Sequence, residues 1–200
     1  MILNNSWYYW RKGLPKDLCN DIIKHALTKR KKEATTGDIK TKEQLENQKV
    51  VIRDSKIVWL NDKWIYDSIR PFINFANEKS GWNFDVDAIE DLQFTIYNEL
   101  DYYNWHADQN AFPYKKGFFK GKTRKISMSI LLNDPNDFEG GELQFDLRNS
   151  SQGDPVLHTI DLNVQGSLVV FPSFLWHRVK PVKKGIRYSL VCWSLGKPFK

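Results

Sequence analysis

The chain has 200 residues, of which 41% are hydrophobic and 14% aromatic, and it carries a formal net charge of +6. This apolar content supports a packed core and excludes an intrinsically disordered chain. No run of about 18 consecutive apolar residues occurs, so we expect no membrane-spanning helix. The length suits a single domain over residues 1–200, and the N-terminus shows neither the basic nor the apolar region of a secretion signal.

The two cysteines, Cys19 and Cys192, lie near opposite ends of the chain. Their spacing is not that of a metal site, and two distant cysteines fit free thiols better than a disulfide framework. Free thiols are typical of a reducing compartment. We therefore expect a cytoplasmic protein.

Basic residues gather in two stretches, KRKKE at Lys29–Glu33 and KKGFFKGKTRK at Lys115–Lys125. A basic surface favours acidic partners, nucleic acid among them. Lysine-rich stretches are also common in solvated loops. Charge by itself leaves both interpretations open.

Residues 15–30 predict a helix, because Pro15 suits a first turn and an apolar stripe follows at helical spacing. His25 lies on this helix, and we interpret it as a structural or surface residue. Residues 32–48 are polar and without periodicity, which predicts a mobile loop, and residues 49–60 are typical of a strand. The apolar stripe consists of Leu18, Ile22, Ala26 and Leu27.

A second helix is predicted over residues 62–79. Asn61 or Asp62 is its expected N-terminal cap. Pro71 lacks a backbone N–H, and it therefore predicts a break or a kink within this helix.

From residue 91 onward, short strand-like runs are separated by turns rich in Gly, Pro, Asn and Asp. Many short strands punctuated in this way favour a sandwich, jelly roll or barrel. We therefore predict a mainly β fold with supporting helices, in which residues 1–90 support a core over residues 91–196. The predicted strands cover residues 91–99, 102–106, 124–132, 141–147, 156–164, 166–171, 175–182 and 186–195.

Alternation within three of these strands predicts one apolar face and one mixed face. We expect the apolar faces to pack against helices and the mixed faces to line an inner cavity. An inward Arg187 is costly unless it meets an anion, which predicts an anionic ligand. The apolar faces consist of Leu92, Phe94 and Ile96, of Ile126, Met128, Ile130 and Leu132, and of Ile186, Tyr188, Leu190 and Cys192. The mixed faces consist of Gln93, Thr95 and Tyr97, of Ser127, Ser129 and Leu131, and of Arg187, Ser189, Val191 and Trp193.

The stretch YYNWHADQN at Tyr102–Asn110 places His106 and Asp108 two residues apart, and a further histidine follows at His177. A lone H-x-D is a weak signal, because it is also an ordinary polar turn. Two imidazoles and one carboxylate, however, form a facial triad that leaves positions open on Fe(II). Zinc also uses such ligands and is the alternative metal. Arg187 follows His177 by ten residues, and its guanidinium could clamp a carboxylate in the same pocket.

With these residues in view, HAD followed by FPSFLWHRVKPVKKGIRYSLVCW resembles the Fe(II)- and 2-oxoglutarate-dependent dioxygenases, most closely their prolyl 4-hydroxylase-like branch. The run RKISMSILLNDPNDFEGGELQF resembles the same branch, and the likeness covers roughly residues 90–195. The resemblance implies a double-stranded β-helix, or jelly roll, with supporting helices. It also implies Fe(II), 2-oxoglutarate and O2 as cofactors and co-substrates, with ascorbate as a candidate addition.

The resemblance also implies residue roles. His106, Asp108 and His177 would bind the iron, and Arg187 would bind the distal carboxylate of 2-oxoglutarate. The remaining expected co-substrate residues are Tyr97, Ser189 and Trp193. Ser189 would replace a second tyrosine that some relatives carry where Leu131 or a neighbour stands here. Tyr97 and Trp193 could equally be plain core residues.

The implied activity is hydroxylation of a C–H bond with release of succinate and CO2. Asp108 favours this over halogenation, because the halogenases of the family carry a small residue at that position. A peptidyl residue, proline first, is the expected substrate of a monomer or weak dimer. The alternatives are a nucleic-acid demethylase, a hydroxylase of small molecules or free amino acids, and a non-enzymatic jelly-roll binding module. Demethylases of the family usually carry a second arginine six residues after the first, where Trp193 stands here.

Aromatic residues near the motif suit a proline ring, although they would also suit a stacked base. The segments 32–48 and 109–122 are expected to lie at the pocket mouth and to become ordered when substrate binds, as lids commonly do. His158 lies outside the motif and is interpreted as a surface residue. The aromatic residues are Tyr102, Tyr103, Trp105, Phe112, Tyr114 and Trp176.

Overall fold

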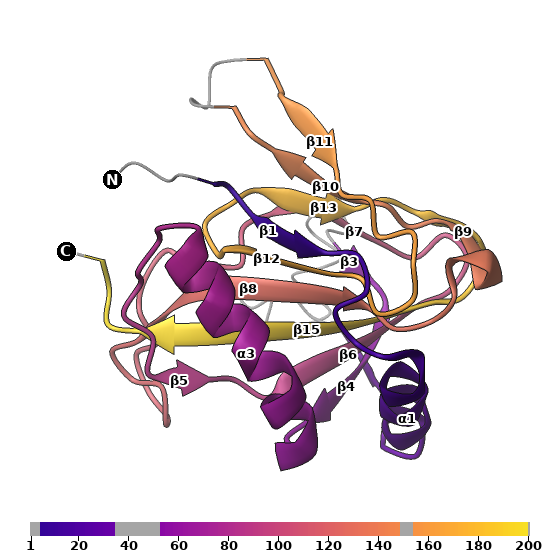
Figure 1. The fold of residues 1–200 in the computed structure, drawn as a ribbon, viewed down its shortest axis with the longest axis horizontal. Coiled ribbons are helices and arrows are strands. Elements are labelled where there is room, and N and C mark those ends of the chain that lie inside the picture. Colours follow the sequence, from indigo (N-terminus) through magenta and orange to yellow (C-terminus); the bar gives the residue numbers. More distant parts are fainter. Residues whose placement is uncertain (1–4, 35–52, 149–153, 200) are drawn as a thin grey trace, which may run out of the picture.

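The computed structural model describes residues 5–34, 53–148 and 154–199. Within these ranges, two α-helices lie against a large antiparallel sheet, and a smaller antiparallel sheet faces the other side of it (Figure 1). The helices and sheets thus form three layers, and this confirms the predicted mainly β fold with supporting helices. Among the described residues, none of the helices is long and apolar enough to cross a membrane.

The two helices are close to the predicted ones. α1 covers Lys16–Leu27, directly after Pro15, and α3 covers Lys63–Lys79, directly after Asp62. α1 is three residues shorter at its C-terminal end than predicted. Pro71 does not split α3, which continues through it.

The large sheet contains eight strands among the described residues, in the order β1-β12-β8-β15-β6-β4-β2, with β5 paired to β15. Its central strand β15 pairs with β8 on one side and with β6 on the other. The strands are β1 (Tyr8–Trp10), β2 (Lys32–Glu33), β4 (Lys56–Leu60), β5 (Ala88–Ile89), β6 (Leu92–Tyr97), β8 (Thr123–Leu131), β12 (Leu168–Pro172) and β15 (Arg187–Gly196).

The small sheet contains five strands among the described residues, in the order β11-β10-β13-β7-β3. A separate two-stranded ribbon pairs β9 with β14, and a short 3-10 helix, η1 (Pro135–Asp137), precedes it. The strands are β3 (Arg53–Asp54), β7 (Tyr102–His106), β9 (Phe138–Gly140), β10 (Leu143–Asp146), β11 (Leu157–Thr159), β13 (His177–Val179) and β14 (Val182–Gly185).

Two apolar clusters hold the layers together, and they confirm the predicted faces. One cluster joins both helices to one face of the large sheet and includes Phe94, Met128 and Leu190. The other lies between the two sheets and includes Tyr97 and Phe171. The mixed faces of β6, β8 and β15 thus point toward the small sheet, as a jelly roll requires.

Some strand boundaries differ from the prediction. The predicted strand at 49–60 is two short strands, β3 and β4, and residues 49–52 lie outside the described residues. The predicted strand at 156–164 is only three residues long. The predicted strand at 175–182 is divided between β13 and β14, because the chain turns from one sheet into the ribbon there. Ile186 precedes β15 and is 39% exposed, so it does not join the apolar face.

Candidate active site

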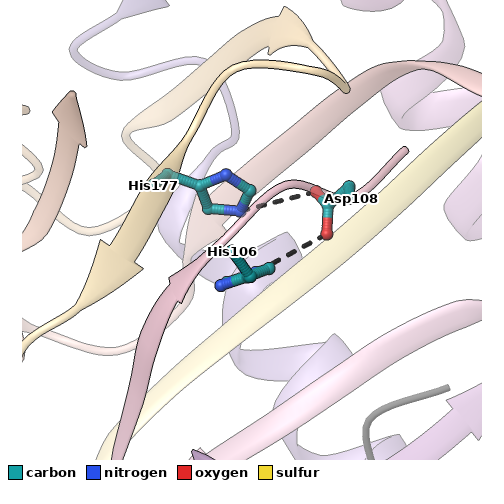
Figure 2. Close-up of side chains that lie close together, drawn as sticks. All are labelled: His106, Asp108 and His177. Atoms are coloured by element: carbon teal, nitrogen blue, oxygen red, sulfur yellow. Dashed lines mark ion pairs between the residues drawn. The ribbon is translucent and has the colours of Figure 1, made fainter. Parts of the chain in front are cut away.

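The side chains of the three residues expected to bind a metal lie close together (Figure 2). His106 ends β7 and His177 begins β13, and the two are direct partners in the register of these antiparallel strands. Asp108 follows β7 by two residues. Its carboxylate oxygens lie 3.7 Å from His106 Nε2 and 3.5 Å from His177 Nε2. Strand pairing therefore brings the distant histidine to the H-x-D motif.

Both histidines are held by their Nδ1 atoms. His106 Nδ1 lies 2.7 Å from the backbone oxygen of Asn104, and His177 Nδ1 lies 2.8 Å from that of Leu175. A carbonyl oxygen only accepts hydrogen bonds, so each Nδ1 donates a proton. Each Nε2 then presents a lone pair toward Asp108. This is the orientation that a metal-binding histidine needs.

The charges of the triad also suit metal binding. Burial lowers the pKa of His106 to about 3, and the neighbouring His177 adds to this effect. Burial alone would raise the pKa of Asp108, but His177, His106 and Arg124 lower it to about 2. At neutral pH, His106 is therefore neutral and Asp108 is ionised, as metal ligands must be.

The donor set fits Fe(II). The possible ligand atoms of the three residues lie within 4.8 Å of one another. Asp108 Oδ2 is buried and has no hydrogen-bond donor among the described residues. A buried carboxylate oxygen without a donor is costly unless a cation binds it. Two nitrogens and one oxygen on one side of an ion leave the other positions open, as in non-haem Fe(II) oxygenases.

Arg187 lies in the interior, on the face of β15 that points toward the small sheet. It is 2% exposed, and its Nη1 has no hydrogen-bond acceptor among the described residues. Burial lowers its pKa, while Tyr97 and Glu142 act in the opposite direction. No carboxylate of the described residues lies within ion-pair distance of it. The guanidinium is thus a buried cation that lacks an anion.

Tyr97, Ser189 and Trp193, the remaining expected co-substrate residues, line the cavity that contains the triad. The cavity is lined by the triad together with Tyr97, Ser129, Ser189 and Trp193. Ser189 lies directly opposite Leu131 in the strand register. The hydroxyl of Ser189 therefore lies beside the position where some relatives would place a second tyrosine.

Arg124 and Glu90 were not identified from the sequence as part of the site. Glu90 accepts hydrogen bonds from Arg124 Nε at 2.9 Å, from Arg124 Nη2 at 2.6 Å and from the Tyr114 hydroxyl at 2.8 Å. The guanidinium of Arg124 also lies 3.9 Å from the centre of the Trp193 ring. Its Nη1 makes a long, 3.5 Å contact with the backbone oxygen of Asp108. This network fixes the backbone of a triad residue and one wall of the cavity.

The basic stretch Lys115–Lys125 is therefore only partly a free basic surface. Arg124 is neutralised by Glu90, and Lys122 forms an ion pair with Asp87 at 2.8 Å. Lys125 is buried and lies over the Phe199 ring. The stretch Lys29–Glu33 is exposed throughout, as expected for a solvated segment, but Lys32 and Glu33 form strand β2 and not the start of the predicted loop.

Tyr103 also lines the cavity, although strict alternation along the strand would point its side chain away from His106. In a regular strand Tyr103 and His106 would point to opposite faces. The register of β7 and β13 shifts between His177 and Val179, and Tyr103 instead faces the same way as His106. The two rings are stacked, with centroids 3.5 Å apart and planes 10° from parallel. A bulge commonly redirects a side chain in this way beside a functional site.

The two histidines outside the motif have structural surroundings. His25 Nε2 lies 2.8 Å from a carboxylate oxygen of Asp62 and joins α1 to the start of α3. His158 is exposed and lies against the Trp7 ring. Both agree with the sequence-based interpretation.

The structure describes the two expected lid segments to different extents. Most of segment 32–48 lies outside the described residues. Segment 109–122 contains no helix or strand, and its base is closed by hydrogen bonds between Tyr114 and the backbone of Gly121 and Lys122. The ordering of both segments on substrate binding stays a prediction.

A jelly roll with an H-x-D pair and a partner histidine in its cavity defines a class, the mononuclear non-haem metal proteins. A family model described as the 2OG-Fe(II) oxygenase superfamily matches residues 92–195, which is more than half of the chain. The chain belongs to this superfamily. The family confirms the expected Fe(II), 2-oxoglutarate and O2, and it favours iron over zinc.

Individual proteins add to this finding. The chain is 34% identical over 104 residues to a PKHD-type hydroxylase of Xylella fastidiosa, a match that covers 50% of this chain and 42% of that protein. It thus spans less than half the length of this relative. A prolyl-4-hydroxylase of Pseudomonas putida has a similar structure, with a TM-score of 0.64, 22% identity, and coverage of 96% of this chain and 94% of that one.

A third similar protein is a prolyl hydroxylase from Trichoplax adhaerens, solved in complex with a peptide fragment of the hypoxia inducible factor oxygen degradation domain. Its TM-score is 0.68 at 19% identity, with coverage of 95% of this chain and 83% of that one. At such identities the two structural likenesses establish the fold alone. They confirm the jelly roll over nearly the whole chain.

Proposed function

We propose that this chain is an Fe(II)- and 2-oxoglutarate-dependent hydroxylase that acts on a polypeptide, with a prolyl residue as the first candidate. The observation that carries the proposal is the pairing of two unsatisfied groups in one interior. The ionised carboxylate of Asp108 has an oxygen without a hydrogen-bond donor among the described residues and lies beside the two imidazoles. Arg187, which has no anion among the described residues, lies on the face of the large sheet that points toward the small sheet. A metal ion would satisfy the first group and a dicarboxylate the second.

Each group then has a defined role. His106, Asp108 and His177 would hold the iron, which when bound supplies the activation of O2 that couples oxidation of 2-oxoglutarate to hydroxylation. Arg187 would hold the distal carboxylate of 2-oxoglutarate, and the Ser189 hydroxyl could donate a second hydrogen bond to it. Tyr97 and Trp193 would shape the cavity and exclude water from it. The overall reaction consumes 2-oxoglutarate, O2 and a C–H bond, and it yields succinate, CO2 and the alcohol.

The polypeptide substrate rests on the similar proteins. The bacterial relative is called a PKHD-type hydroxylase, and both similar structures described above are prolyl hydroxylases, one of them with a bound peptide. Exposed aromatic side chains agree with this, because Trp176, next to His177, is 54% exposed and offers a ring face. Such a face suits a proline ring.

The metal assignment is tested by substitution of the histidines. The purified protein should bind one Fe(II) under anaerobic conditions, and His106→Ala should lose stoichiometric binding. His158→Ala, which changes an exposed histidine, is the matched control and should bind as the wild type does. Full iron occupancy in a His106→Ala, His177→Ala double variant would contradict the assignment.

The substrate is tested by succinate release. The iron-loaded protein is given proline-containing peptides, the same peptides with proline replaced by alanine, methylated oligonucleotides and free amino acids. We expect only the proline-containing peptides to raise succinate above the uncoupled background and to gain one oxygen atom by mass spectrometry. Stimulation by oligonucleotides alone would indicate a demethylase, and stimulation by free amino acids alone would indicate a small-molecule hydroxylase. If the iron-loaded protein forms no succinate with any substrate, the binding-module interpretation replaces the enzyme.

A further inference from the structure

Arg53 forms the outer end of a stack that leads to the proposed iron ligand His106. Arg53 and Tyr103 are direct partners in the register of β3 and β7. The guanidinium carbon lies 4.5 Å from the centre of the Tyr103 ring, and this ring is in turn stacked on the imidazole of His106. Each member of the stack thus restricts the next.

The same guanidinium also connects the two sheets. Arg53 belongs to the small sheet, but its Nε donates to the Ser55 hydroxyl at 2.9 Å, ahead of β4. Its Nη1 and Nη2 make long hydrogen bonds, of 3.4 and 3.5 Å, to Gln93 and Thr95 on β6 of the large sheet. The planar fork of an arginine can make these contacts while one face lies on an aromatic ring, which a lysine ammonium cannot do. Gln93 and Tyr103 both line the cavity, so the connection lies at its wall.

No carboxylate of the described residues lies within ion-pair distance of Arg53. Among the described residues its partners are neutral oxygens and one aromatic ring, so these contacts orient the guanidinium and do not neutralise its charge. The small sheet has a similar pair on its other face, and this pair offers a control for a merely structural role. There, Arg178 lies 4.7 Å from the Trp105 ring and donates twice to Gln144 Oε1. Arg178 points away from the cavity, since its neighbours His177 and Val179 both line it.

We propose that Arg53 is a positioning residue for the iron centre, which acts through Tyr103 to hold the imidazole plane of His106. The hydrogen bond from Nδ1 to Asn104 restrains the ring at one atom and leaves some freedom to tilt about the Cβ–Cγ bond. The stacked Tyr103 ring restrains the plane of the imidazole, and Arg53 keeps Tyr103 in place. The inference rests on the proposed metal site but adds a residue from outside the matched family region. Groups that orient a metal-binding histidine typically change metal affinity by about 10-fold to 100-fold when they are removed.

The experiment measures Co(II) binding by visible absorption, which reports both affinity and coordination geometry. Arg53→Met keeps the aliphatic stem and removes the charge and the donors. We expect it to weaken Co(II) binding by about tenfold and to change the absorption bands. Arg53→Lys restores the charge but not the fork, and it should recover only part of the affinity. Arg178→Met makes the same chemical change on the outer face and should bind as the wild type does.

A double-variant cycle tests the route of the effect. If Arg53 acts through Tyr103, then Arg53→Met should cause no further loss of Co(II) affinity in a protein that already carries Tyr103→Leu. Additive losses would overturn the proposed route, and wild-type affinity and bands in Arg53→Met would overturn the inference as a whole. Thermal unfolding of each variant identifies any that fails to fold, and Arg53→Lys then carries the test. A wild-type protein that binds no Co(II) would overturn the proposed metal site itself, and this inference with it.

Discussion

Arg187 on β15 lies directly opposite Tyr97 on β6, and its guanidinium carbon is 5.6 Å from the centre of the Tyr97 ring. The arginine is almost fully buried, and burial lowers its pKa. An aromatic face stabilises a cation less than a carboxylate does. Tyr97 lines the cavity, and Arg187 beside it is a buried cation that an anion would stabilise.

Arg187→Met should weaken the binding of 2-oxoglutarate by two to three orders of magnitude. Loss of one member of a buried charge pair costs roughly 3–5 kcal/mol, and each tenfold change in affinity is about 1.4 kcal/mol. Isothermal titration of the metal-loaded protein measures the change. Arg11→Met alters an exposed arginine and serves as the control. Unchanged affinity in Arg187→Met would mean that the carboxylate binds elsewhere.

Gly141→Ala should weaken 2-oxoglutarate binding by about tenfold, or about 1.4 kcal/mol. A Cβ at Gly141 would lie 2.8 Å from Arg187 Cδ and 3.1 Å from Val182 Cγ2, so the arginine would have to move. Gly117→Ala is the matched control, because Gly117 has a similar positive φ of 79° against 67° but no atom within 4 Å of the added Cβ. Both variants should lose stability through backbone strain. Equal affinities in the two variants would show that Gly141 does not shape the arginine site.

Glu90→Gln should lower the free energy of unfolding by about 3–5 kcal/mol, because it leaves Arg124 as an uncompensated buried charge. The carboxylate of Glu90 receives two hydrogen bonds from Arg124 and one from Tyr114. Urea unfolding followed by tryptophan fluorescence measures the loss. In comparison, Asp67→Asn breaks the exposed ion pair with Lys63 on α3 and should cost less than about 1 kcal/mol. A loss in Glu90→Gln as small as this would indicate that water compensates Arg124.

The metal-free protein should lose stability as the pH falls below about 6.5, the ordinary pKa of histidine. Burial, followed by the effect of His177, lowers the pKa of His106 to about 3 in the folded state. Between pH 6.5 and pH 3 the unfolded chain therefore binds the proton and the folded chain does not. The free energy of unfolding should then fall with decreasing pH by up to about 1.4 kcal/mol per pH unit from this group.

Unfolding curves recorded in a chelator across this range test the pH dependence. His106→Gln should flatten the slope, whereas His158→Gln changes an exposed side chain and should retain it. Asp108 acts in the same direction at lower pH, because its pKa of about 2 lies below its ordinary value. A slope that is identical in His106→Gln and the wild type would assign the pH dependence to other groups.

Much of the candidate site was predictable from the sequence, because its information is local. H-x-D occupies three consecutive positions, and the alternation of β15 places Arg187, Ser189 and Trp193 on one face whatever the neighbouring strands are. The same alternation assigned Phe94, Met128 and Leu190 to the helix-covered face. The resemblance then linked His177 to His106 across the intervening residues, and the strand register agrees.

Other members of the site depend on a strand irregularity or on contacts between distant segments, which no local pattern shows. Tyr103 reaches His106 only because β7 is irregular, and a strict period of two would turn it away. Arg124 reads as one of several cations in a basic stretch, and only the fold places it beside Glu90 and over Trp193.

Arg53 shows the same limit most clearly. The sequence by itself predicted that residues 49–60 form a strand, because β-branched residues are frequent in this segment. Only the tertiary structure decided that this strand belongs to the small sheet and that its arginine crosses to β6. Periodicity follows from the backbone geometry of each strand, but the partner of a side chain depends on which strands pair and how the two sheets face each other.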